Sequence, residues 1–154
     1  MGVDDVEQLL ATSVGLSVTR VRRIWYLNPD GSLEGDRGPI ELLLSDGSVR
    51  LLECGRAGEI LRIKIEEWID AFAPPLAPEN VRYIRECGKY AAFDMTGKPP
   101  YDGLSGAITN AEPVWRGENL TGTVLTMSTG EVLTVDCDGD KTWVIIGSSD
   151  PHYM

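Results

Sequence analysis

Apolar and polar residues alternate along residues 39–54 with the period of two that a half-buried β-strand shows. The first run ends at Asp46-Gly47, a dipeptide typical of a tight hairpin turn. The return run carries Leu52 and Cys54 two positions apart. The pattern therefore predicts an antiparallel hairpin. The residues that its first strand turns toward a core are Ile40, Leu42 and Leu44.

The same pattern returns 83 positions later in the chain. Residues 40–63 and 123–146 form 24 aligned pairs, of which six are identical, whereas chance gives about one or two. The identical pairs are Leu42/Leu125, Ser45/Ser128, Gly47/Gly130, Val49/Val132, Cys54/Cys137 and Ile63/Ile146. A second similarity lies upstream, where Gly-Leu-Ser precedes a tryptophan at residues 15–25 and again at 103–115. We interpret the chain as an internal duplication.

Each copy continues into a third apolar run and so predicts a three-strand meander. One meander cannot bury its apolar face alone, whereas two copies that face each other can. We therefore expect a single, mainly β domain, either a β-sandwich or a partly open barrel with pseudo-two-fold symmetry. The repeats span approximately 15–66 and 103–147, with a connector at 67–102. Trp25 and Trp115 then hold equivalent places, as core anchors or as aromatic walls of a pocket between the repeats.

The remaining segments show shorter patterns. Apolar residues at helical spacing predict a short N-terminal amphipathic helix over residues 6–10. Trp68 and Phe72 are four positions apart, which predicts a short helical turn with both rings on one face. Residues 81–88 favour a second short helix, and residues 89–95 favour a strand.

The residues that usually carry chemistry are sparse. Cys54, Cys87 and Cys137 are odd in number and lie far apart, so the sequence indicates neither a disulfide framework nor a zinc site. Cys54 and Cys137 hold matching positions, which most simply makes them small apolar core residues. His152 is the single histidine, and phosphate-loop and nucleophile-elbow patterns are absent from the sequence. The sequence thus predicts no catalytic residue, no metal ligand and no cofactor.

The formal net charge of −10 argues against nucleic acid as a partner and favours a basic protein. One acidic group surrounds Trp68. A second lies in DCDGDK, which fits a hairpin turn, a weak surface cation site or a partner contact, but not a calcium loop. The basic residues 20–23 are expected on the wet face of a strand, beside carboxylates. The candidate partner contacts are Glu66, Glu67, Asp70, Asp136, Asp138 and Asp140.

The sequence also bears on location and assembly. No apolar run approaches the roughly 20 residues of a membrane helix. The chain begins with acids rather than with the basic region of a secretory signal. We therefore expect a cytoplasmic protein without a membrane partner. A homodimer formed through exposed strand edges remains an alternative.

The hairpins DGSVRLL and TGEVLTV, together with the acidic turn DGD, resemble small uncharacterised bacterial proteins of duplicated β-meander type. Some proteins of this type are thought to be immunity proteins for polymorphic toxins. The resemblance covers about half of the chain and implies a cytoplasmic, non-enzymatic inhibitor that plugs a toxin. We expect a non-enzymatic protein-binding module. The alternatives are a small-molecule-binding domain with a pocket between the repeats, a hydrolase or isomerase that uses carboxylates alone, and a structural role.

Overall fold

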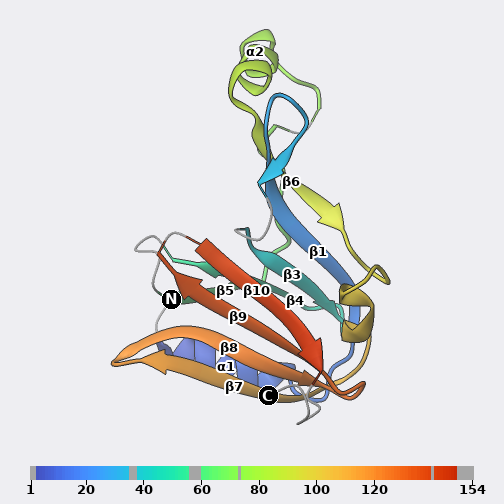
Figure 1. Cartoon of the computed structure of the whole chain (residues 1–154), viewed down its shortest axis with the longest axis vertical. Helices are drawn as coiled ribbons and strands as arrows, with labels where there is room; N and C mark the ends of the chain where they lie inside the picture. The colour runs from blue at the N-terminus through green and yellow to red at the C-terminus, as the bar shows by residue number, and fades with distance from the viewer. Residues whose placement is uncertain (1–2, 35–37, 56–59, 73, 140, 149–154) are drawn as a thin grey trace.

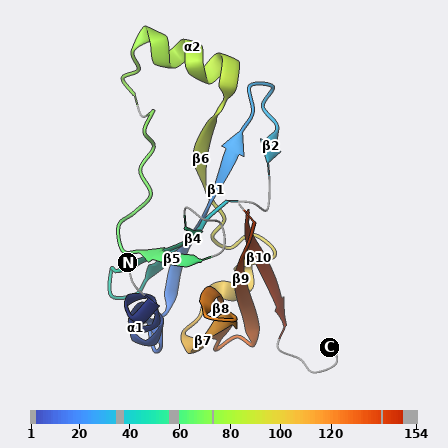
Figure 2. The same ribbon diagram turned by 90° about the vertical axis from the view of Figure 1, so that its left-hand side faces the viewer.

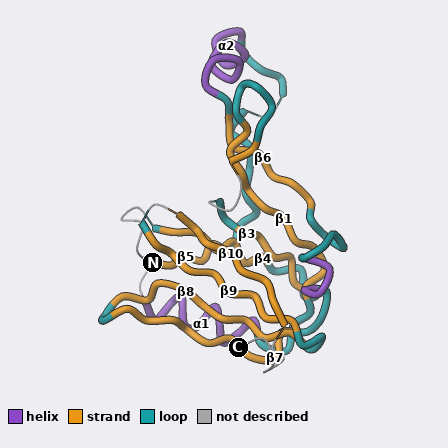
Figure 3. Tube along the Cα trace, viewed as in Figure 1, coloured by secondary structure: helices purple, strands orange, loops and turns teal. Residues whose placement is uncertain are grey.

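The computed structural model describes residues 3–34, 38–55, 60–72, 74–139 and 141–148 of the chain. Two antiparallel sheets stack as an open sandwich, and strands make up most of the regular structure (Figures 1 and 3). The prediction of a mainly β fold is therefore confirmed. None of the described helices is long and apolar enough to cross a membrane.

The first sheet is built mainly from the first half of the chain. Its strands run in the order β2-β1-β3-β4-β5, and β6 pairs with β1. Their bounds are β1 (Val18–Leu27), β2 (Leu33–Glu34), β3 (Ile40–Leu44), β4 (Val49–Cys54), β5 (Leu61–Lys64) and β6 (Lys89–Asp94). The second sheet has the order β10-β9-β8-β7. Its strands are β7 (Ile108–Arg116), β8 (Asn119–Met127), β9 (Glu131–Asp138) and β10 (Lys141–Ser148).

The two sheets repeat one plan, because β1, β3, β4 and β5 correspond to β7, β8, β9 and β10 in the same order. The register between β1 and β3 shifts after Val18, and the register between β7 and β8 shifts after its equivalent Ile108. Backbone bonds across the junction are reciprocal: Val18 N donates to Gly106 O at 3.0 Å, and Ile108 N donates to Leu16 O at 2.8 Å. The predicted duplicated meanders with pseudo-two-fold symmetry are therefore confirmed.

The sequence suggests that equivalent residues of the two copies are always 83 positions apart, but this does not hold for the third strands, β5 and β10. Cys54 faces Leu61 in the first sheet, and Cys137 faces Thr142 in the second. Leu61 follows Cys54 by seven positions, whereas Thr142 follows Cys137 by five. The equivalent of Ile63 is consequently Val144 rather than Ile146. Since the side chains of a strand alternate with a period of two, the shift of two residues keeps the apolar ones on the core face.

Both sheets and the N-terminal helix α1 (Val3–Ser13) contribute to one apolar core. Leu42 and Leu125, which hold equivalent positions in the two copies, are buried in this core. Val6 and Leu10 of α1 are buried in it as well. α1 packs against β5 and β7. The predicted N-terminal helix is thus confirmed. The division into one domain, with its repeat and connector boundaries, stays a prediction.

Cys54 and Cys137 form a disulfide, with their Cα atoms 5.5 Å apart. The prediction that they are separate apolar core residues without a bridge was wrong. Their separation of 83 residues equals the offset of the repeat, so each cysteine is bonded to its own equivalent. A bond between equivalent residues of two related copies lies on the pseudo-two-fold axis. The bridge therefore joins β4 of the first sheet to β9 of the second.

The connector holds more structure than a linker does. It contains α2 (Pro78–Cys87), strand β6 and the short 3₁₀ helix η1 (Tyr101–Leu104), so the expected helix and strand are both present. α2 and the adjoining ends of β1 and β6 project from the sandwich as an arm (Figure 2). Residues 65–72, in contrast, form no helix, and the predicted helical turn was wrong. Hydrogen bonds of the Trp68 backbone with Arg22 and Glu41 of the first sheet hold this segment against the sheet.

The basic residues 20–23 divide between the two faces of β1. Arg20 and Arg22 lie on the outer face and pair with carboxylates, as expected. Arg23 is 1% exposed, which contradicts the expectation of a wet face for that residue. Its guanidinium donates to Tyr101 Oη at 2.8 Å and to Gly38 O at 3.1 Å. Neutral oxygens therefore satisfy part of this buried charge.

Candidate functional site

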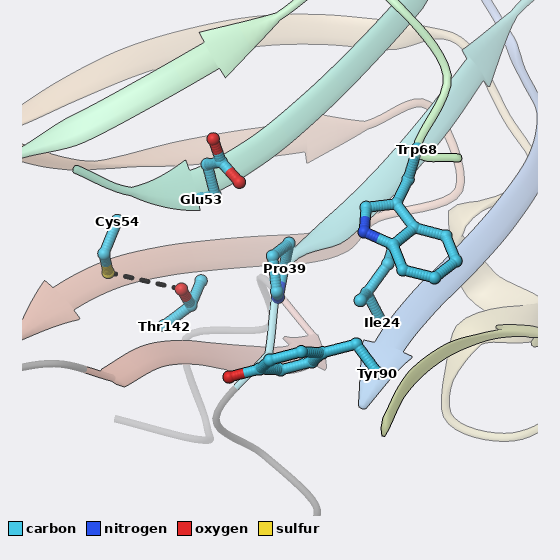
Figure 4. A pocket seen from close by; sticks show the side chains of 7 residues that line it. All are labelled: Ile24, Pro39, Glu53, Cys54, Trp68, Tyr90 and Thr142. Atoms are coloured by element: carbon cyan, nitrogen blue, oxygen red, sulfur yellow. Dashed lines mark hydrogen bonds between the residues drawn. The ribbon is translucent and has the colours of Figure 1, made fainter. Parts of the chain in front are cut away.

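A pocket of about 250 Å³ lies where the two sheets and the connector meet (Figure 4). We call it the junction pocket. It draws on β1, β4, β6 and β10, the residue before β3, and the 65–72 segment. Trp68 and Tyr90 supply its aromatic walls. In the view of Figure 4, Glu53 lies across the pocket from Tyr90. Its lining residues are Ile24, Pro39, Glu53, Cys54, Trp68, Tyr90 and Thr142.

A buried ion pair sets the position of Trp68. Glu41 is 1% exposed on the outer face of the first sheet. Its two carboxylate oxygens accept hydrogen bonds from Arg22 at 2.6 and 2.8 Å. The backbone N–H of Trp68 donates to the same carboxylate at 2.7 Å, and the Trp68 carbonyl accepts from Arg22 at 3.1 Å. The 65–72 segment is therefore fixed over the first sheet by side chains of that sheet.

The same contacts determine the protonation of Glu41. Burial alone raises the pKa of this carboxyl, because the charged form loses water. The hydrogen bonds from Arg22 and from the Trp68 backbone, with the charges of Arg22 and Arg20, outweigh burial and hold the pKa below its usual value. The ion pair consequently stays charged at neutral pH.

The polar groups of the junction pocket are few. Lys64 Nζ lies 3.1 Å from Glu53 Oε1, so the charge of Glu53 is compensated. The Thr142 hydroxyl donates to Cys54 Sγ at 3.2 Å. Glu53 is the one carboxylate among the lining residues.

The aromatic residues of the pocket differ from those that the sequence suggests. Neither Trp25 nor Trp115 lines the junction pocket. Trp25 packs on Phe93, with 5.7 Å between ring centroids, and the Arg23 guanidinium lies 5.0 Å from the Trp25 ring. Trp115 is exposed on β7. The tryptophans hold equivalent strand positions, but the connector rather than the repeat supplies the walls of the pocket.

The acidic candidates around Trp68 lie on the 65–72 segment. Glu66 is exposed, and Glu67 forms an ion pair with Arg20 at 2.8 Å. Asp70 pairs with Lys89 of β6 and accepts a hydrogen bond from the backbone N–H of Phe72. Burial raises the pKa of Asp70, but Lys89 and the Phe72 N–H bring it below its usual value. Asp70 therefore ties the segment to the arm.

The second acidic group lies on β9, in the other sheet. Arg116 Nη2 pairs with Asp136 Oδ2 at 2.5 Å, and Arg116 Nη1 lies 3.7 Å from Asp138 Oδ1. Asp140 lies outside the described residues. The structure thus brings Asp136 and Asp138 to one cation, and places the group around Trp68 on a different element. A role in partner contact stays a prediction for both groups.

The outer face of the second sheet is open to solvent around Trp143 and Ile145 of β10, which are 38% and 60% exposed. Trp143 lies opposite Asp136 in the ladder, with Lys141 Nζ 5.5 Å from its ring. Asp136 Oδ1 is buried and has no hydrogen-bond partner among the described residues. Sequence reasoning missed these two apolar residues because it read the third strand only for its inward side chains.

The corresponding face of the first sheet is covered. Glu41 is the equivalent of Val124, since Glu41 faces Arg22 and Val124 faces Glu112 at matching register positions. Glu41 holds the 65–72 segment, whereas Val124 is only partly buried and offers no polar anchor. One outer face therefore carries a segment of its own chain, and the other presents Trp143 and Ile145.

Among the residues that the structure describes, no three histidine, cysteine, aspartate or glutamate side chains group as metal ligands would. The comparisons with known proteins found no matching family model, no matching curated protein and no matching solved structure.

Proposed function

We propose that the chain is a non-enzymatic protein-binding module that contacts a positively charged partner through the outer face of its second sheet. The observation that carries this proposal is the exposure of Trp143 and Ile145 on that face, at 38% and 60%. Large apolar side chains that stand together on a surface are typical of contact sites.

The arrangement around Trp143 has the composition of a binding site. Tryptophan is among the residues that contribute most to the affinity of protein interfaces, particularly when polar groups surround it. Asp136, Asp138 and Lys141 supply such a rim next to Trp143.

The charge of the chain selects the class of partner. A net charge of −10 attracts a basic protein over several ångströms and repels a second copy of this chain. A toxin with a positively charged groove for binding nucleic acid would fit this description. An immunity role, which the resemblance of the hairpins implies, is thus one form of the proposed function.

The disulfide bears on where this binding takes place. Disulfides persist in oxidising compartments and are rare in the cytosol of most organisms. The Cys54–Cys137 bridge therefore favours an oxidising compartment over the cytoplasm that the sequence suggested. Thiol labelling of the chain in intact cells distinguishes the two, because a bridged chain leaves only Cys87 reactive.

The test begins with a photo-crosslinker in place of Glu112, at the edge of the exposed face. Any protein crosslinked to it is then produced separately, and its affinity is measured by calorimetry. We expect Trp143→Ala to weaken binding about 30-fold, the effect of losing about 2 kcal/mol at a central interface residue. Trp115→Ala, which also removes an exposed tryptophan of this sheet, is the matched control and should change the affinity less than threefold.

Equal affinities of the parent chain and Trp143→Ala for the reconstituted partner would contradict the proposal. So would a partner whose binding does not weaken with added salt, because attraction between opposite charges is screened. The junction pocket favours small-molecule binding as a second candidate. That alternative predicts that a metabolite raises the melting temperature of the parent chain but not of Trp68→Leu.

A further inference from the structure

The free edges of the two sheets are protected to different degrees. β5 is four residues long, carries Arg62 and Lys64, and leads into the 65–72 segment. β7 has two register irregularities, contains Pro113, and packs against α1. β2 has two residues, and β6 begins and ends with charged residues. Short length, charge, proline, irregular register and cover are the features that keep sheet edges from pairing with other chains.

β10 lacks these features. It pairs with β9 over eight consecutive residues, and no register shift is present within the ladder. Apart from Lys141 at its start, the strand has neither a charged residue nor a proline. Val144 and Ile146 pack against the core, while Trp143 and Ile145 face solvent. No described strand pairs with its second edge.

We infer that the free edge of β10 accepts an extended segment of the positively charged partner, which adds as a fifth strand to the second sheet. This inference rests on the proposed function and specifies how the partner binds. Strand addition gives affinity through backbone hydrogen bonds, and side chains at alternate positions give specificity. Every second residue of the added strand would lie on the same face as Trp143 and Ile145.

The neighbouring groups determine what chemistry the added strand carries. Asp136 and Asp138 lie on β9, the strand next to β10, and face Trp143 and Lys141 in the ladder. The junction pocket is at the start of the same edge, because Thr142 lines it together with Glu53. Arg116 and Lys141 already lie beside these two carboxylates, so it is the net charge of −10 over the whole chain that favours basic residues, alternating with apolar ones, in the added strand. A second copy of the chain would bring its own net charge of −10 to the same place.

Designed peptides test the inference on the full-length chain. The probe is a peptide amide of alternating lysine and valine, and its matched control replaces each lysine with glutamate. Two further lysine peptides carry N-methyl groups on alternate backbone amides, one in each register. N-methylation removes hydrogen-bond donors from one edge of a strand and leaves the side chains in place, so only one of the two registers can retain the bonds to β10.

We expect saturable binding of the lysine peptide, with amide shifts and slowed amide exchange centred on residues 143–147. One of the two N-methylated peptides should bind at least tenfold more weakly than the unmethylated lysine peptide. The affinity of the other should stay within threefold of it. Ile145→Lys places a charge at an exposed position of the edge and should weaken binding at least tenfold. Asn110→Lys adds the same charge on β7 and should have less than a threefold effect.

Several outcomes would overturn the inference: no saturable binding of the lysine peptide, equal binding of the two N-methylated registers, or shifts centred on β5 or β7. Self-association of the chain that Ile145→Lys abolishes would assign the edge to a second copy instead. These results differ from a failure of the proposed function. If Trp143→Ala still impairs binding of the native partner while the registers behave alike, the face is a docking surface and only strand addition is wrong.

Discussion

The Cys54–Cys137 bridge closes a loop of 83 residues and cross-links β4 of the first sheet to β9 of the second. In the chain-entropy description, a bridge stabilises the fold because it restricts the unfolded chain, and the effect grows with the logarithm of loop length. For this loop the lost entropy is about 15 cal/mol/K, which corresponds to about 4.5 kcal/mol at 298 K. We therefore predict that Cys54→Ala/Cys137→Ala lowers the free energy of unfolding by about 4.5 kcal/mol.

Urea unfolding, followed by tryptophan fluorescence, measures this change. With a urea dependence of about 2 kcal/mol/M, the midpoint should fall by about 2 M. Cys87→Ala is the matched control, because Cys87 is exposed and unbridged, and its midpoint should stay within about 0.3 M of the parent chain. The parent chain treated with a dithiol before unfolding should reproduce the result of the double variant.

Labelling provides an independent readout of the same bridge. Under denaturing conditions without reductant, a maleimide should modify Cys87 alone, and after reduction it should also modify Cys54 and Cys137. Labelling of all three cysteines before reduction would refute the bridge. Equal urea midpoints for the double variant and Cys87→Ala would refute the reasoning from loop entropy.

Three further predictions concern packing and charge. Glu41→Gln should lower the free energy of unfolding by about 3 kcal/mol in urea titrations, because the buried carboxylate loses its charged hydrogen bonds with Arg22 and the Trp68 backbone, and it should also shift the emission of Trp68. The folded-state pKa of Glu41 lies below its unfolded value near 4.3, so the stability that Glu41 contributes is complete above that pH and is lost as pH falls. Acid titration should therefore show a larger loss of stability in the parent chain than in Glu41→Gln, in which carboxyls such as Asp70 still titrate. Gly122→Ala should lower the melting temperature, since a Cβ there would overlap Val135 O, with about 2 kcal/mol lost, whereas Gly147→Ala meets no atom within 4 Å and should have little effect.

The architecture could be predicted from sequence because its signals are local and repeated. Alternation with a period of two identifies strands such as β3 from a few consecutive residues, and the second copy repeats the evidence. The turn at Gly47 recurs at Gly130, and both glycines have positive φ, at 87° and 91°. The pairing order follows from short connections between neighbouring strands.

Features that depend on distant contacts could not be predicted in this way. Matching cysteines show that two positions are equivalent, but not that the symmetry axis passes between them. The spacing of Trp68 and Phe72 fits a helix locally, yet Glu41, 27 residues earlier, binds the Trp68 backbone and keeps it extended. The charge of Arg23 suggests an exposed position in the sequence. Only the fold brings Tyr101 and Gly38 close enough to accept its hydrogen bonds and so allows its burial.

The asymmetry between the two equivalent halves is the basis for placing the proposed function on one of them. If the copies differed in nothing, both outer faces would be covered or both would be open. Among the many positions at which they differ, one is central to the outer face, where the first sheet has Glu41 and the second has Val124. A carboxylate can hold the backbone of a segment from its own chain, whereas valine offers only apolar contact. Among the residues that the structure describes, no segment of the chain covers the second face and no strand pairs with the outer edge of β10. For this reason we propose the second copy, rather than the first, as the surface that a partner binds.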